Sequence, residues 1–274
     1  MIDRSIIESA IEIADNIFKV KVPVRTTRQG QLIGPARYNF INDSVELIQT
    51  FIEEYHCKFD SKEKLITHAI CHEFGHAKES RYFAEGEIFP FYLKISKTSS
   101  IKAPPVLANL YDLSEALGYV MNGLLDYSID DKLKNYRIKN IAAKYKIDLM
   151  KKFLISKKDG KKNSKEEKLR ATFNLPIDIG YYDLAELTNC EREVIIEYHE
   201  FVGIYEKWDT VRHILKSKIF AETKEFLDTV QNLYSELLGI QVKKNLHYKK
   251  EFQKKFGKLP EFWKKDAYHI FYLD

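Results

Sequence analysis

The sequence predicts an α+β protein that is predominantly α-helical, with a small β-hairpin or meander near its start and a helical C-terminal region. Two observations lead to this class. Apolar residues recur at steps of three and four from Ile6 to Phe18, which indicates an amphipathic first helix. The stretches "FKVKVPV" and "ARYNFI" alternate apolar and polar residues on either side of the turn-rich "RQGQLIGP", which indicates short strands.

Helical periodicity returns after these strands. Asn42, Asp43 and Ser44 are suited to cap a second helix over 45–55. Asp60, with a glutamate three residues later, predicts the start of a third helix. We expect 82–105, with its glycine and prolines, to be loop with at most an edge strand, and a long helix to follow from about 106 to 136.

A polar segment divides the chain. Residues 151–170, "KKFLISKKDGKKNSKEEKLR", hold nine basic and three acidic residues, which predicts a charged, mobile linker. The expected organisation is therefore a first domain over 1–150, the linker over 151–170, and a helical C-terminal region over 171–274. In that last region the apolar pattern predicts helices at about 184–208, 211–238 and 246–256.

Composition restricts the class of protein. The 44 basic and 40 acidic residues give a net charge of only +4, which does not by itself indicate a nucleic-acid or membrane-surface binder. The three cysteines have no metal-site or disulfide spacing and are expected to be reduced. Acidic residues interrupt the first apolar stretch, and no run approaches the ~18 apolar residues of a membrane span. We expect a soluble cytoplasmic protein.

The stretch "LITHAICHEFGHAKES" contains an H-E-x-x-H array formed by His72, Glu73 and His76. On a helix the two histidines lie one turn apart on one face, so both imidazoles can reach a single Zn²⁺. Glu73 is turned by about 100° from His72 and is placed to act as a general base toward water. An alternative is that the histidines are ordinary, partly buried residues paired with acids. Gly75 is a poor helix former, and we expect it to allow another backbone or a substrate to approach closely.

A catalytic zinc needs a third protein ligand and an open position. No third histidine follows closely, since the next is His199. The better candidates lie on the helix expected at 106–136, where Asn122, Asp126 and Asp130 follow one another at steps of four. We assign Asp126 as the third ligand and expect Asp130 and Asn122 to orient the ligating histidines. Glu115 as the ligand, or a merely solvated acidic face, are the alternatives.

His72-Glu73-Phe74-Gly75-His76 followed by Asp126-x-x-x-Asp130 resembles the gluzincin arrangement of metallopeptidases, with Asp in place of the usual ligating Glu, as in aspzincins. The order helix, hairpin, helix, motif helix is also similar to compact minimal zincin domains such as SprT-like proteases, although those carry a third histidine. The resemblance covers about 1–136. It implies a zincin-like domain within 1–150 and a Zn²⁺ cofactor.

The expected function is a zinc-dependent metallopeptidase that cleaves a peptide or protein with a zinc-bound water activated by Glu73. The "ARYNFI" strand could bind an extended substrate along its edge. A non-catalytic zinc-binding regulatory protein is the alternative. A nucleic-acid-associated zinc protease is another, because 243–265 holds nine lysines among aromatic residues. His68, one turn before His72, could be an additional ligand, but it is expected to support the site or lie on the surface because three protein ligands suffice. A tyrosine could stabilise the oxyanion, and the sequence leaves open Tyr92, Tyr111, Tyr119 and Tyr127. It does not determine the oligomeric state.

Overall fold

The computed structural model describes residues 2–28, 34–55, 62–95, 113–157, 165–217 and 223–273. Within these ranges the chain is an α+β protein, mostly helical, with two small mixed sheets of three strands each. The predicted class, α+β and predominantly α-helical, is therefore confirmed. None of the described helices is long and apolar enough to span a bilayer.

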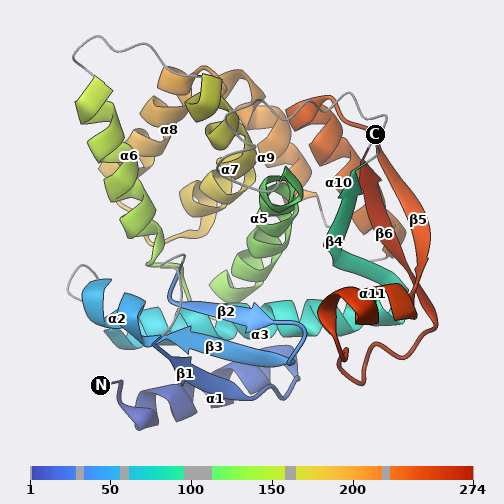
Figure 1. Ribbon diagram of the computed structural model, residues 1–274. Coiled ribbons are helices and arrows are strands. Elements are labelled where there is room, and N and C mark those ends of the chain that lie inside the picture. Colours follow the sequence, from blue (N-terminus) through green and yellow to red (C-terminus); the bar gives the residue numbers. More distant parts are fainter. Residues whose placement is uncertain are drawn as a thin grey trace.

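The N-terminal part combines one sheet with three helices, and its strand order is β1-β3-β2. The elements are α1 (Arg4–Phe18), β1 (Val24–Thr27), β2 (Ala36–Asn39), β3 (Ser44–Ile48), α2 (Gln49–Tyr55) and α3 (Lys62–Glu85). Helix α1 packs against α3 through buried residues such as Ala10 and Ala14, and their small side chains allow the helices to approach closely. Figure 1 shows α3 running along the sheet, with β2 at the edge that faces α5.

The expected helix at 45–55 is wrong in its first half. Residues 44–48 form β3, which lies between β1, to which it is parallel, and β2, to which it is antiparallel. Val45, Leu47 and Ile48 are all buried. A central strand covered on both faces has a nearly continuous apolar run, which fits the period of a helix as well as that of a strand. Residues 44–48 form a strand because they pair with both β1 and β2. The hairpin is consequently β2–β3. The expected strand "ARYNFI" is found as β2, whereas "FKVKVPV" is wrong as a strand, because Phe18 ends α1, 19–23 are irregular and β1 begins only at Val24. In the sheet β1 and β2 are not neighbours.

The second part is built on α5, which lies between the N-terminal layer and the other helices (Figure 1). Its elements are α5 (Leu113–Lys134), α6 (Ala143–Lys157), α7 (Lys165–Leu184), α8 (Asn189–Val202), a 3₁₀ turn (Tyr205–Lys207), α9 (Trp208–Lys216) and α10 (Thr223–Leu238). Helix α5 packs most extensively on α7 and also contacts α3. A large apolar core surrounds α5 on this side, whereas Ile129 and Leu133 near its end join the core of the N-terminal layer.

The linker expected at 151–170 is helical at both described ends. Residues 151–157 complete α6 and 165–170 begin α7, while 158–164 lie outside the described residues. Leu154 is buried in the same apolar core as residues of α5 and α8, and Phe153 packs against it. The charge-rich composition misled the prediction because helices with apolar inner faces carry charges outside, as at the exposed Lys152 of α6 and Lys168 of α7.

A second sheet corrects the expectation of a helical C-terminal region. It has the order β4-β6-β5, formed by β4 (Ile88–Ile95), β5 (Val242–Tyr248) and β6 (Ala267–Leu273), with α11 (Lys249–Phe256) between β5 and β6 in the chain. The helix expected at 246–256 therefore starts only at Lys249, because 242–248 pair along β6. Strand β4 is an edge strand, as the sequence analysis allowed, and it is parallel to β6.

The lysine-rich stretch 243–265 spans β5, α11 and the following loop. Its aromatic side chains mostly form a core: Phe252 and Trp263 are buried against Phe89, and Phe256 packs onto the same cluster. Tyr248, by contrast, is 56% exposed. The aromatic residues are thus spaced for packing, and nucleic-acid binding at this stretch stays a prediction.

Candidate metal centre

Three side chains converge between the helices α3 and α5. His72 and His76 lie one turn apart on α3, and Asp126 projects from α5. The Nε2 atom of His72 is 3.3 Å from Oδ1 of Asp126, and the Nε2 atom of His76 is 3.1 Å from the same oxygen. The three ligand atoms all lie within 4.8 Å of one another. The structure thus brings together the two histidines of the motif and the aspartate assigned as third ligand.

The spacing of these atoms fits a small tetrahedral cation. With bonds of about 2.0–2.1 Å, two ligand atoms of a tetrahedral Zn²⁺ are roughly 3.3 Å apart. The two Nε2–Oδ1 distances agree with that value. Two imidazoles and one carboxylate are also a donor set that zinc accepts, and they leave the fourth position for water or substrate.

Each imidazole has a carboxylate behind it, which makes a hydrogen bond at His72 and lies only at ion-pair distance at His76. The Nδ1 atom of His72 is 2.7 Å from Oδ1 of Asp130, and the Nδ1 atom of His76 is 3.3 Å from Oε2 of Glu79. A carboxylate at Nδ1 fixes the orientation of the ring and makes Nε2 a better donor to a cation. Both histidines are therefore set to present Nε2 at one point. Glu79 lies three residues after His76 on the same helix, a spacing that the sequence analysis did not use.

Asp130 is itself fixed by two further groups. Nε2 of His68 lies 3.0 Å from its Oδ1, and the amide of Asn140 donates to its Oδ2 at 3.4 Å. His68, Asp130 and Asn140 are all buried. His68, His72 and Asp130 also form a second group of potential ligands, but Nδ1 of His72 already engages Asp130 at hydrogen-bond distance. We therefore interpret His68 as a support for Asp130, one of the roles considered from the sequence.

Two glycines allow the helices to approach closely enough to form the site. A Cβ atom added to Gly75 would lie 2.6 Å from Cγ2 of Ile129, so α3 and α5 touch between the two histidines. On the other side of α5, a Cβ atom on Gly123 would lie 2.7 Å from Cβ of Pro176 in α7. Close packing is thus found at Gly75, but the neighbour is the side chain of Ile129 on α5 and not the backbone or substrate that was expected.

The charges at this point favour a cation. Burial opposes the imidazolium form of His76, but Asp126 and Glu79 outweigh it and raise the pKa of His76 to about 10. Burial likewise opposes charge on His72, and Asp130 and Asp126 nevertheless raise its pKa well above the ordinary value. Although burial acts in the opposite direction, the two histidines lower the pKa of Asp126 to about 2. Without an ion the carboxylates favour protonated imidazoles. The same negative potential would favour a metal cation, which must displace those protons because a ligating imidazole is neutral.

Glu73 lies beside this group and not within it. Its Oε2 accepts a hydrogen bond of 2.6 Å from the backbone N–H of Tyr38 in β2. In an antiparallel pair, every second residue of a strand bonds to its neighbour strand. The bond from Ile48 N–H to Pro35 C=O fixes this alternation, so residues 37 and 39 bond to β3. The backbone groups of Ala36 and Tyr38 therefore point away from β3. The contact therefore joins the carboxylate to the outer edge of β2 and leaves Oε1 for another partner.

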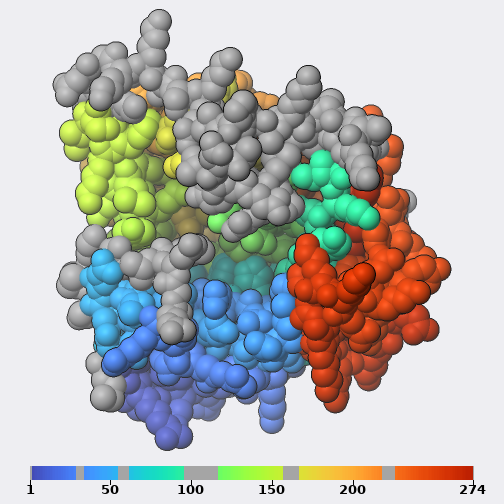
Figure 2. All heavy atoms as spheres, viewed as in Figure 1, coloured from blue at the N-terminus to red at the C-terminus, as the bar shows by residue number. Residues whose placement is uncertain are grey.

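The group opens into a cleft of about 920 Å³, near the upper end of the range for ligand sites. Its walls include the β2 edge, α3, α5, α6 and α7, and all the site residues His72, Glu73, His76 and Asp126 line it. Figure 2 shows the surface hollowed between the N-terminal sheet and α6, with atoms of α3 and α5 recessed.

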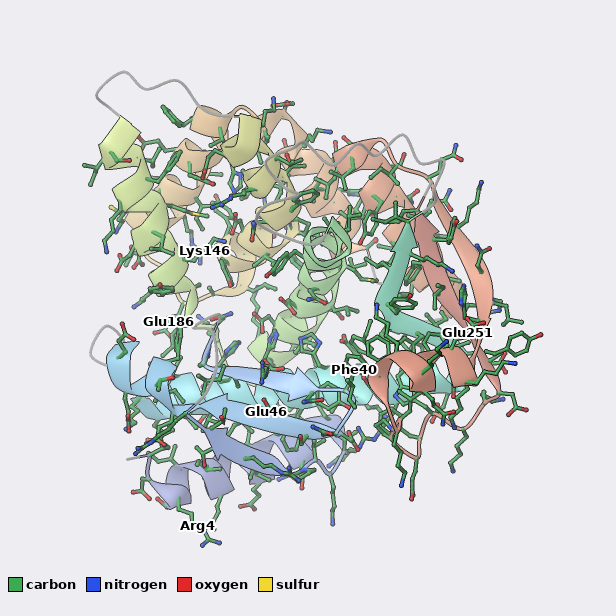
Figure 3. The ribbon with its side chains drawn as sticks, in the orientation of Figure 1. Arg4, Phe40, Glu46, Lys146, Glu186 and Glu251 are labelled. Carbon is green, nitrogen blue, oxygen red and sulfur yellow. The ribbon has the colours of Figure 1, made fainter. Side chains whose placement is uncertain are left out.

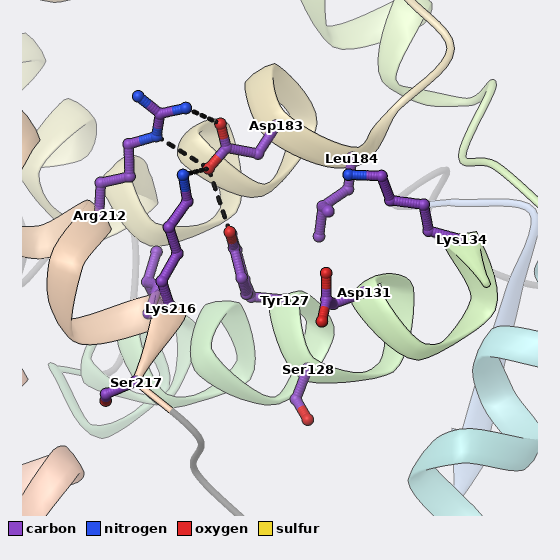
Figure 4. Close-up of a pocket in the computed structure, with 10 residues that line it drawn as sticks. Tyr127, Ser128, Asp131, Lys134, Asp183, Leu184, Arg212, Lys216 and Ser217 are labelled. Carbon is purple, nitrogen blue, oxygen red and sulfur yellow. Dashed lines mark hydrogen bonds and ion pairs between the residues drawn. The ribbon is translucent and has the colours of Figure 1, made fainter.

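The structure separates the candidate tyrosines. The hydroxyl of Tyr127 donates to Oδ2 of Asp183 at 3.1 Å, on the far side of α5, where Arg212 and Lys216 hold the same carboxylate (Figure 4). Tyr92 belongs to the aromatic cluster around α11, and Tyr111 lies outside the described residues. Tyr119 lines the cleft.

A tyrosine that the sequence analysis missed lies closer to the site. Tyr181 of α7 lines the cleft near Asp126. Burial, and then the charge of Asp126, raise its pKa, so the phenol keeps its proton. No hydrogen bond engages its hydroxyl among the described residues. No local signal marks Tyr181, because only the packing of α7 on α5 brings it there.

The remaining predicted residues have other surroundings. Asn122 lines the cleft one turn before Asp126, yet within the described ranges it makes no hydrogen bond to His72, His76 or Asp126. The orienting contacts come from Asp130 and Glu79. Glu115 falls within α5, but its side chain lies outside the described residues.

Comparison with known proteins gives no relative for this chain. No family model matches it, no curated protein is similar to it, and no solved structure resembles it. Interpretation of the site therefore depends on its chemistry alone.

Proposed function

We propose that the protein is a zinc-dependent metallopeptidase. The observation that carries the proposal is the convergence of two Nε2 atoms on one Oδ1 atom, at distances that suit ligands of one tetrahedral ion, with Glu73 beside them in a cleft edged by a strand. A purely structural zinc site is closed by four protein ligands, whereas a group of three beside a carboxylate in a cleft is typical of a catalytic site.

Each surrounding residue has a defined part in the proposed reaction. His72, His76 and Asp126 would hold the ion, and Asp130 and Glu79 would keep the two imidazoles in place. When bound, Zn²⁺ would supply a Lewis acid that polarises a carbonyl and lowers the pKa of water to about 7. Glu73 would accept a proton from the water that attacks the scissile carbonyl carbon and deliver it to the amine as the C–N bond breaks.

The edge of β2 is suited to hold the substrate chain. Ala36 directs its backbone N–H and C=O, and Tyr38 its C=O, away from β3 on the side of the cleft, while the N–H of Tyr38 is already bonded to Glu73. The remaining edge groups suit an extended peptide that adds as another strand. The Tyr181 hydroxyl, which keeps its proton, could donate to the oxygen that becomes negative during attack. These two features support a peptide substrate.

Glu73→Gln tests the proposal because it removes the base and keeps a side chain that can still accept the hydrogen bond from Tyr38. We expect zinc content and thermal unfolding to be unchanged, while hydrolysis of a peptide library falls by about 10²–10⁴-fold. Glu85→Gln, an exposed position at the end of α3, is the matched control. A zinc-loaded wild type that cleaves no peptide bond would favour the non-catalytic alternative.

A further inference from the structure

The cleft extends beyond the metal centre to an end formed by α6, α7 and α8, where its charge changes. Lys146 of α6, and Glu167 and Arg170 of α7, line this end together with Tyr198 of α8. Figure 3 shows Lys146 projecting from α6 toward the interior of the molecule. Two cations against one carboxylate leave an excess of one positive charge here, whereas the other end carries Glu73, Asp126 and Asp130.

Lys146 has an incomplete set of partners for an ammonium group. Its Nζ donates to Oδ1 of Asn174 at 3.2 Å, in a half-buried position, and it forms no ion pair with any described residue. The amide of Asn174 is oriented by its own bond to the backbone oxygen of Arg170 at 2.8 Å. Since an ammonium carries three N–H donors, two of those of Lys146 remain for a partner in the cleft.

Among the described residues that line this end, the one carboxylate is engaged elsewhere. Glu167 accepts a hydrogen bond of 2.8 Å from the hydroxyl of Tyr198, which ties α7 to α8. The walls around Lys146 are largely aromatic and include Tyr145, Phe153 and Phe173. At this half-buried position a single carboxylate would pair with the charge of the ammonium and take up its remaining donors.

We propose that Lys146 and Asn174 form a carboxylate-binding subsite of the cleft, so that substrates carry a carboxylate at a fixed distance from the cleaved bond. This inference rests on the proposed peptidase function. An acidic side chain and the C-terminal carboxylate of the substrate share the required chemistry. The subsite would select a substrate by its charge, while the β2 edge binds the peptide backbone without regard to sequence.

The test is digestion of two synthetic peptide libraries by the zinc-loaded protein, with products identified by mass spectrometry. One library has free C-termini and the other has amidated C-termini. Selection of acidic side chains would appear in both libraries as Asp or Glu at one position relative to the cut. Selection of the C-terminus would appear as cuts at one distance from the end, and only in the first library.

We expect Lys146→Met to reduce the preference for the carboxylate by about 10–100-fold, the value of one charged hydrogen-bonded contact. Lys146→Arg should keep most of the preference, and Asn174→Asp should abolish it by supplying an internal carboxylate, which also provides a second variant if Lys146→Met does not fold. Lys152→Met, exposed on the same helix, is the control and should behave as wild type.

The outcomes separate the two proposals. Cleavage with a preference that Lys146→Met and Asn174→Asp remove would support the subsite. Cleavage with no carboxylate preference, or with one that both variants retain, would overturn the subsite and leave the peptidase intact. Absence of cleavage in both libraries would overturn the peptidase, and with it the subsite that depends on it.

Discussion

Nδ1 of His72 lies 2.7 Å from Oδ1 of Asp130, while Nε2 of the same ring faces Asp126. One imidazole is thus held between two carboxylates that lie one turn apart on α5. The spacing of four residues on each helix makes this possible, because α3 presents His72 and His76 on one face and α5 presents Asp126 and Asp130 on the opposing one. The contact also separates the roles of the two aspartates, which the following predictions use.

The metal content of the purified protein should be about one zinc per chain. His72→Ala or His76→Ala should lose it, because two remaining ligands do not hold Zn²⁺ tightly. His213→Ala, at an exposed position of α9, is the matched control and should keep its zinc. Elemental analysis after gel filtration without chelators measures the result. Wild type that takes up no zinc even when it is supplied would contradict the assignment of the centre.

Asp126→Ala should weaken zinc binding more than Asp130→Ala. Loss of Asp126 removes an oxygen that would contact the ion, so zinc affinity should fall by more than 100-fold. Loss of Asp130 only frees the ring of His72 and should cost about 10–100-fold. Competition with a fluorescent chelator measures both constants. Asp131→Ala, an exposed neighbour on α5, should have no effect. Equal losses at positions 126 and 130 would argue against the assigned third ligand.

Gly75→Ala should destabilise the fold and weaken zinc binding together. The new Cβ would lie 2.6 Å from Cγ2 of Ile129 and would push α5 away from α3. The free energy of unfolding should fall by about 1–3 kcal/mol through overpacking, partly offset by the better helix propensity of Ala. The double variant Gly75→Ala/Ile129→Ala should show a favourable coupling in a double-mutant cycle by urea unfolding. Strict additivity of the two changes would exclude a direct clash.

Tyr181→Phe should lower kcat by about 10²–10³-fold, the loss typical of one oxyanion donor, with KM and zinc content nearly unchanged. Tyr127→Phe removes a hydroxyl that is bonded to Asp183, outside the metal centre, and should leave kcat as it is. Steady-state kinetics on one cleaved peptide separate kcat from KM. If Tyr181→Phe were instead to raise KM alone, the hydroxyl would serve substrate binding and not the reaction.

The helical elements and the paired spacings could be predicted because they depend on short-range geometry. His72, Glu73 and His76 take their relative positions from 3.6 residues per turn, whatever packs around them. The same holds for Asp126 and Asp130. Strand β3 could not be told from a helix, since its run of buried residues fits both periods and only β1 and β2 decide between them.

The sequence by itself determined which side chains could bind a cation and which faces of two helices carry them. Only the tertiary structure decided that those faces meet, because the approach of α3 to α5 depends on contact between Gly75 and Ile129, 54 positions apart. The tertiary structure also brought Tyr181 and Lys146 into the same cleft, although no motif around either residue indicates a functional site. Such contacts arise from the packing of apolar surfaces over long sequence separations, which a pattern of neighbouring residues does not record.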